Sequence, residues 1–139
     1  MKLRSHVVAS IMFSTLFFLV FKSWTIAVVS FFSGVLIDCD HILDYFWEFR
    51  KRLRVKELFD AHYNGKISFS GVMLHSWELL FLLNIYAFII SCNLWAIGVA
   101  LGLTQHVALD QIFNKSNRLS YFFLWRLKNK FNAKVMFTK

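Results

Sequence analysis

The chain has 139 residues, of which 58% are hydrophobic and 19% aromatic, and its formal net charge is +8. This length fits one structural unit better than two domains, and the apolar share exceeds that of an ordinary soluble domain. The positive charge is the kind that orients a protein in a membrane and attracts it to anionic lipid. We therefore expect membrane lipids as partners and no nucleic acid.

Three stretches of the sequence contain no charged residue: 5–21, 23–37 and 79–109. A membrane-spanning helix needs roughly 20 apolar residues, so the third stretch is too long for one helix and must fold back on itself. We predict tight turns at Lys22-Ser23 and at Asn93. The predicted helices cover about 5–21, 24–46, 70–92 and 94–113.

The predicted fold class is all-α, namely an integral membrane four-helix bundle made of two helical hairpins and followed by a basic interfacial helix. The transmembrane domain would cover 1–114, with a polar segment at about 47–70. No acidic residue follows Asp110, and the segment 115–139 mixes aromatic residues with lysines and arginines. This composition is typical of a helix in the membrane interface, although docking of a cytosolic protein is an alternative. No cleavage site follows Phe21, so we expect the first helix to remain in the mature chain.

Ionisable residues concentrate at one depth of the predicted bundle. Counted from the two turns at 1.5 Å per residue, they lie roughly 20–28 Å from the outer surface. Ionisable groups are costly inside a membrane and are usually paired, hydrated or functional. The predicted metal ligands among them are Asp38, Asp40, His41, His75, His106 and Asp110.

Sequence spacing suggests that these residues share helical faces. His106 and Asp110 are four residues apart, while His75 and Glu78 are three apart, so each pair can face one direction. Imidazoles and carboxylates without thiolates suit Zn, Mn or Fe. We expect one or two divalent ions, with Zn as the first choice.

Glu78 and His6 are the predicted catalytic residues, because each could transfer a proton to or from a bound water. Each also has a purely structural alternative. His6 could be a hydrogen-bonded packing residue, and Glu78 could orient a ligand imidazole or pair with the basic segment. His62, in the polar segment, fits a solvated residue better than a ligand.

The order of these motifs resembles a known family. A histidine opens the first helix, Asp38-x-Asp40-His41 ends the second, a His75-Ser76 pair follows, and His106-x-x-x-Asp110 lies on the last helix. Together they resemble the LexA-binding, inner-membrane-associated metal-dependent hydrolases over about residues 5–114. The chain departs from the family in having Ile37 where a proline is usual, and in lacking the arginine-containing histidine segment. The resemblance implies a cell inner (cytoplasmic) membrane location.

The sequence thus favours a membrane-embedded metal-dependent hydrolase that opens near the cytoplasmic face and acts on a phosphorylated or ester-bearing lipid. The alternative is a non-catalytic inner-membrane protein with a structural metal that binds a cytosolic regulator. A cation carrier is disfavoured, because few polar residues continue into the outer halves of the helices.

Membrane topology gives the first testable prediction. Of the 16 Lys and Arg residues, all except Lys22 lie outside the helices on one side of the predicted membrane, so the positive-inside rule places both termini in the cytoplasm. A reporter enzyme that is active only after export should be inactive when fused after Lys139. The same reporter inserted at Lys22 serves as the positive control. Strong activity of the fusion after Lys139 would contradict the four-span topology.

Overall fold

The structure is a computed structural model that describes residues 3–40, 71, 73–114 and 116–136. The described residues form helices and connecting turns without any β-strand, which confirms the all-α prediction at this level. They belong to two compact units, Met1–Ile37 with Leu74–Asn114 and Asp38–Met73 with Lys115–Lys139. Each unit is described by itself below.

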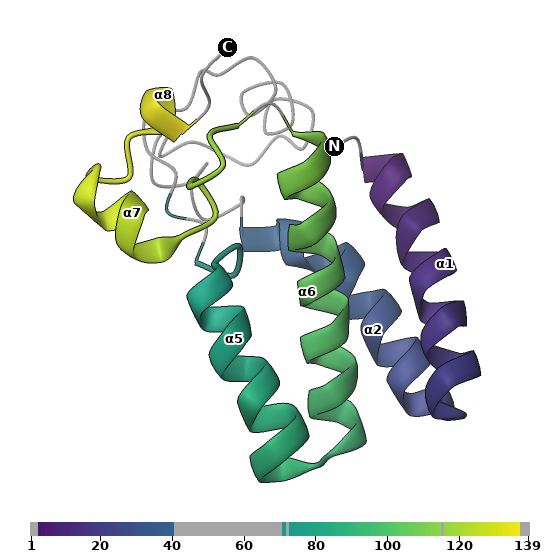
Figure 1. The fold of residues 1–139 in the computed structure, drawn as a ribbon. Coiled ribbons are helices and arrows are strands. Elements are labelled where there is room, and N and C mark those ends of the chain that lie inside the picture. Colours follow the sequence, from purple (N-terminus) through teal and green to yellow (C-terminus); the bar gives the residue numbers. More distant parts are fainter. Residues whose placement is uncertain (1–2, 41–70, 72, 115, 137–139) are drawn as a thin grey trace, which may run out of the picture. The chain divides into compact units, whose positions relative to one another are not determined.

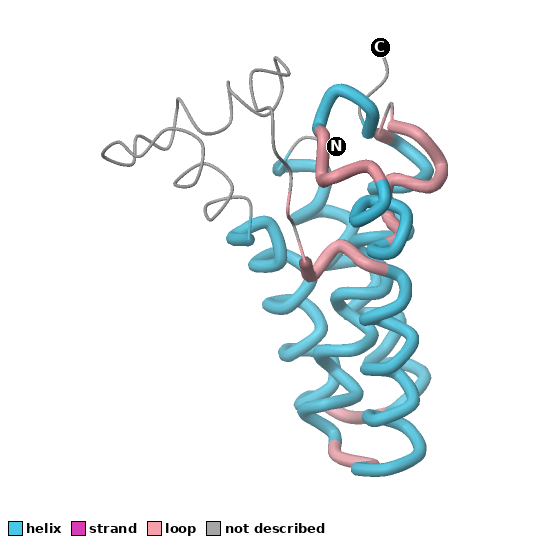
Figure 2. The backbone as a smooth tube through the Cα atoms, turned by 90° about the vertical axis from the view of Figure 1, so that its left-hand side faces the viewer, coloured by secondary structure: helices cyan, strands magenta, loops and turns pink. Residues whose placement is uncertain are grey.

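The first unit contains two helical hairpins (Figure 1). Its helix α2 packs against both α1 and α6, and α5 packs against α6. Both hairpin turns lie at the same end of this unit, which is also clear in the tube view of Figure 2. The elements in chain order are α1 (Leu3–Phe21), α2 (Trp24–Leu36), α5 (Trp77–Ile85), a π-helix (Tyr86–Ser91) and α6 (Leu94–Phe113).

Both hairpin turns lie where the sequence predicts them. In each turn, the residue just before the N-cap of the second helix has a positive φ, which reverses the direction of the chain. This residue is Lys22 (φ 52°) in the first turn and Cys92 (φ 47°) in the second. The Ser23 hydroxyl then accepts a hydrogen bond from the Ile26 amide, and the Asn93 side chain accepts one from the Trp95 amide. Such N-caps satisfy amides that have no partner inside the helix, so the chain turns without glycine or proline.

The predicted end of the second helix lies outside the described residues, and the predicted start of the third helix was wrong. The α-helical part of α2 ends at Leu36 and tightens into a 3₁₀ turn at Ile37–Cys39, whereas residues 41–46 of the predicted helix lie outside the described part. Helix α5 begins at Trp77 rather than near residue 70, because Ser76 is extended (φ −124°, ψ 124°) and acts as its N-cap. His75 therefore precedes the helix.

Two described helices are long and apolar enough to cross a membrane, Arg4–Phe21 and Leu94–Phe113. The apolar helical segments Trp24–Cys39 and Trp77–Ser91 are shorter. The predicted four spans are thus present in part, as two candidate spans and two shorter apolar helices.

Residues 116–136 of the second unit contain two short helices in place of the one predicted basic helix. These are α7 (Phe123–Lys128) and α8 (Ala133–Met136). Between them, Lys130 and Phe131 have φ values of 52° and 53°. Two successive left-handed residues cannot continue a right-handed helix, so the chain changes direction there.

Glycines allow α2 and α6 to approach closely. A Cβ added to Gly102 would clash with the Ser30 carbonyl oxygen and lie 3.0 Å from the Gly34 backbone nitrogen. A Cβ added to Gly34 would in turn lie 3.1 Å from the Gly102 carbonyl oxygen. Side-chain atoms of Ser33 and Gln105 lie closer still, but side chains can rotate away. Because the Ser30 carbonyl is a backbone group, the two helices have to separate to admit a side chain at Gly102.

We therefore expect Gly102→Ala to destabilise the protein. Alanine favours a helix over glycine by about 1 kcal/mol, but forced separation of packed helices costs about 1–3 kcal/mol or more, so the net change should be a loss. Equilibrium denaturation in detergent micelles would measure it. Ala96→Val, which adds more atoms at a half-buried position of α6, is the control and should be nearly neutral. Unchanged stability of Gly102→Ala would contradict the backbone contact.

Candidate metal centre

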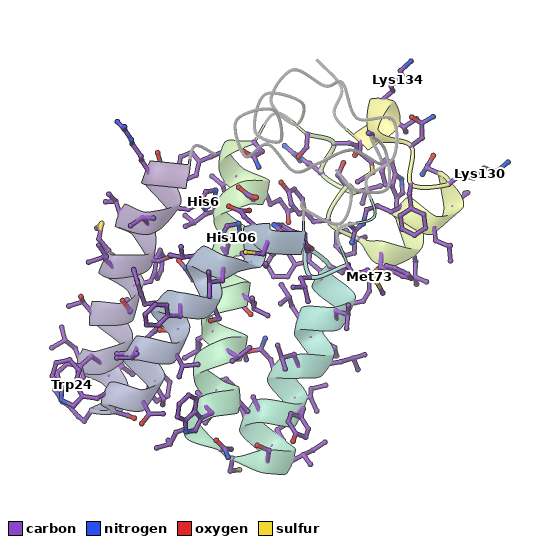
Figure 3. All side chains as sticks on the ribbon, turned by 180° about the vertical axis from the view of Figure 1, so that it is seen from behind. His6, Trp24, Met73, His106, Lys130 and Lys134 are labelled. Atoms are coloured by element: carbon purple, nitrogen blue, oxygen red, sulfur yellow. The ribbon has the colours of Figure 1, made fainter. Side chains whose placement is uncertain are left out.

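Three histidines surround one carboxylate in the first unit. His6 comes from α1, His75 from the residues just before α5, and His106 and Asp110 from α6. None of the four is more than 5% exposed. Figure 3 labels His6 and His106, whose rings stack with centroids 4.0 Å apart and an angle of 13° between their planes. The ring of His75 stands edge-on to that of His106, at 5.4 Å and 82°.

The two oxygens of Asp110 face different histidines. Oδ1 lies 3.0 Å from His6 Nε2, whereas Oδ2 lies 3.6 Å from His106 Nε2 and 3.9 Å from His75 Nε2. A buried carboxylate is costly unless positive charge or hydrogen-bond donors compensate it. The carboxylate is therefore held on one side by His6 and faces two imidazole nitrogens on the other.

The backbone of α2 orients the ring of His106. Its Nδ1 lies 2.6 Å from the Gly34 carbonyl oxygen, which can only accept a hydrogen bond, so Nδ1 carries the proton. In the neutral ring, Nε2 then has the free lone pair and points toward Asp110. Fixing the tautomer by a backbone carbonyl is typical of metal-binding histidines. Gly102 lies one turn before His106 on the same face, so the close approach of the glycines also brings this carbonyl within reach.

His75 lies just before α5, next to residues that hold the start of this helix. The next residue, Ser76, is the fully buried N-cap of α5. The Trp77 indole nitrogen donates a hydrogen bond to the Gln111 side-chain oxygen, which ties the start of α5 to the end of α6. Further along the same pair of helices, the Asn84 amide donates to the Thr104 hydroxyl at 2.9 Å. These contacts join α5, which His75 directly precedes, to α6, which carries Asp110.

The donor set fits a divalent transition metal. One ligand atom each from His75, His106 and Asp110 lies within 4.8 Å of the others. Two ligands that are each 2.1 Å from a tetrahedral ion would lie about 3.4 Å apart, and the Asp110 Oδ2 distances to the two imidazoles are 3.6 and 3.9 Å. Small side-chain adjustments would bring these atoms to coordination distances.

Sequence reasoning missed two polar neighbours of this cluster. The Gln105 amide donates to the Ser10 hydroxyl at 2.9 Å, and both side chains are buried. Among the described residues, the other amide atom, Gln105 Oε1, has no hydrogen-bond partner, nor does His6 Nδ1. The available signal was spacing, because Ser10 lies one turn after His6 and Gln105 adjoins His106.

The other predicted site residues belong to the second unit, lie outside the described residues or lie at the start of α5. Asp38 directly follows Ile37 and, like Asp40, belongs to the second unit. His41 lies outside the described residues. Glu78 is half-buried in the first turn of α5, but the predicted helical face shared with His75 was wrong because His75 lies outside that helix.

Comparison with known proteins identified no relative of this chain. No family model, curated protein or solved structure matches this chain. The resemblance to the metal-dependent hydrolases therefore remains a prediction from motif order.

We expect His75→Ala and His106→Ala to lower bound metal and thermal stability together, because an ion that binds only the folded state stabilises it. Elemental analysis and thermal unfolding of the same preparations would measure both. The control is Asn84→Ala, which removes the hydrogen bond to Thr104 and should lower stability while the metal stays. Full metal content in both histidine variants would contradict a metal centre.

Proposed function

We propose that this protein is a membrane-embedded metal-dependent hydrolase whose active site lies near the cytoplasmic face. The observation that carries the proposal is the buried Asp110 carboxylate, whose Oδ2 faces the Nε2 atoms of His75 and His106. The motif order that resembles the LexA-binding, inner-membrane-associated hydrolases supports the same assignment.

The proposed ligands are His75, His106 and Asp110, completed by Asp38. The last assignment rests on chain connectivity: Asp38 follows Ile37, which is 2% exposed, and consecutive Cα atoms are about 3.8 Å apart. Asp40 and His41 remain proposed ligands from the sequence and would serve a second ion. Zn is the proposed metal, with Mn or Fe as alternatives.

The proposed membrane arrangement has four spans with both termini in the cytoplasm. The two long apolar helices, α1 and α6, support it, and their hairpin partners are the shorter apolar segments Trp24–Cys39 and Trp77–Ser91. In this arrangement Asp110, three residues before the end of α6, lies near one membrane surface rather than at its centre.

A divalent ion bound here would lower the pKa of a bound water towards neutrality and polarise an ester or phosphoryl oxygen. The side chains have separate roles. His106 is kept in one tautomer by the Gly34 carbonyl, and His6 holds one oxygen of Asp110. Glu78, half-buried at the start of α5, is the proposed proton acceptor, with His6 as the alternative proton carrier.

The proposed substrate class is a phosphorylated or ester-bearing lipid. A site near the end of a membrane helix lies at the level of lipid headgroups, where such bonds are found. Basic residues in the polar central segment and the tail would attract anionic headgroups.

The test is Glu78→Gln, which keeps the size of the side chain and removes its basicity. We expect metal content to stay the same and hydrolysis to fall by about 100-fold or more. The assay uses the metal-loaded protein with bis-p-nitrophenyl phosphate, p-nitrophenyl phosphate and a p-nitrophenyl fatty acyl ester. His106→Ala is the control that should lose both metal and activity.

Other outcomes would change the assignment. A metal affinity reduced by about 10–100-fold would make Glu78 a residue that orients a ligand imidazole. Full metal and full hydrolysis would transfer the proton-carrying role to His6. If the native protein holds metal tightly and hydrolyses none of these esters, the structural-metal alternative replaces the hydrolase.

A further inference from the structure

The C-terminal segment 117–136 closes on itself. The Asn117 amide and the Ser120 hydroxyl both donate hydrogen bonds to the Met136 carbonyl oxygen, at 2.9 and 2.8 Å. The rings of Phe123 and Phe131 pack with centroids 5.8 Å apart. Because its two ends are joined by these bonds, the segment is a defined fold rather than an extended tail.

Two features of burial in this segment are unusual, one for a charged side chain and one for apolar side chains. The side chain of Arg126 is fully buried. Large apolar side chains are exposed instead, at 67% for Leu124 and 52% for Leu127. With Lys128, these two leucines share one face of α7, at spacings of three and four residues. We call the exposed apolar residues the tail surface, which comprises Leu119, Phe122, Leu124, Leu127 and Val135.

The charge beside the tail surface has one sign. Lys128, Lys130 and Lys134 are exposed, and no acidic residue occurs anywhere after Asp110. Figure 3 shows the side chains of Lys130 and Lys134 extending away from the backbone. Exposed leucines gain little from a nucleic-acid backbone, whereas lysines next to exposed leucines suit the boundary between anionic headgroups and acyl chains.

The chain also limits how far this segment can move from α6. The six residue steps from Phe113, the last residue of α6, to Leu119 span at most about 21 Å. If α6 crosses the membrane, as the proposed function requires, the tail surface stays within reach of the lipid headgroups. Such tethering raises the effective concentration of lipid, so weak binding is sufficient.

We infer that residues 117–136 form a peripheral element that binds anionic lipid, with Leu124 and Leu127 entering the acyl boundary and the three lysines contacting headgroup phosphates. The inference rests on the proposed membrane insertion and does not depend on the metal or on hydrolysis. Its role is to hold the C-terminal segment on the membrane surface in a lipid-dependent way.

The test uses the full chain in lipid nanodiscs. Cys39 and Cys92 are both exposed and free, so replacing them by Ser allows a single spin label at Leu127→Cys. We compare nanodiscs of pure phosphatidylcholine with nanodiscs of an equal mixture of phosphatidylcholine and phosphatidylglycerol. We expect the accessibility of the label to a water-soluble nickel complex to be several-fold lower in the mixture. A label at Asn132→Cys, which is exposed but outside the tail surface, is the matched control and should stay accessible to water.

A second part of the test removes the positive charges of the segment. Replacing Lys128, Lys130 and Lys134 by Gln should abolish the response to phosphatidylglycerol, since each basic residue near an anionic surface contributes about 5-fold to the binding equilibrium. High salt should weaken the response of the native chain as well. A label at Leu124→Cys repeats the measurement at a second position.

The outcomes separate this inference from the proposed function. If labels at positions 124 and 127 are equally accessible to water in both lipid mixtures, the inference is wrong, whatever the metal content. Protection that appears only after adding an acidic cytosolic protein also overturns it. A chain that does not remain in the nanodisc overturns the membrane arrangement together with this inference, whereas loss of metal with an intact lipid response affects the metal centre alone.

Discussion

The burial of Asp110 is the constraint on which the first unit depends. This carboxylate is 5% exposed near the end of a helix that is otherwise long and apolar. Its charge has to be compensated within the unit, because an isolated buried carboxylate would destabilise the fold. The compensation comes from three parts of the chain at once, through His6, His75 and His106.

That compensation requires close packing of the surrounding helices. The short approach of α2 to α6 at Gly34 and Gly102 places a backbone carbonyl on His106 Nδ1. On the other side, the Trp77 to Gln111 hydrogen bond ties the start of α5 to the end of α6 and so limits the movement of His75. The same contacts thus determine both the packing of the helices and the orientation of the candidate ligands. A substitution that changes the packing should therefore also change the orientation of the ligands.

The two units place their polar groups in opposite ways. In the first, many large apolar side chains are exposed, whereas His6, His75, His106 and Asp110 are buried. In the segment 117–136, lysines and leucines share the surface while Arg126 is buried. The first pattern suits helices surrounded by lipid chains, and the second suits an element at the boundary between lipid and water.

The sequence by itself determined the elements whose signals are local. Uncharged runs predicted α1 and α6, and the polar residues Lys22-Ser23 and Asn93 predicted the turns, because each of these signals lies within the segment that it describes. The i, i+4 spacing also paired His106 with Asp110. Tertiary structure decided that His75 precedes its helix, that the Gly34 carbonyl selects the tautomer of His106, and that the tail folds into two short helices. These features depend on contacts between residues far apart in the chain, such as the 2.6 Å approach of Gly34 to His106, which no local pattern encodes.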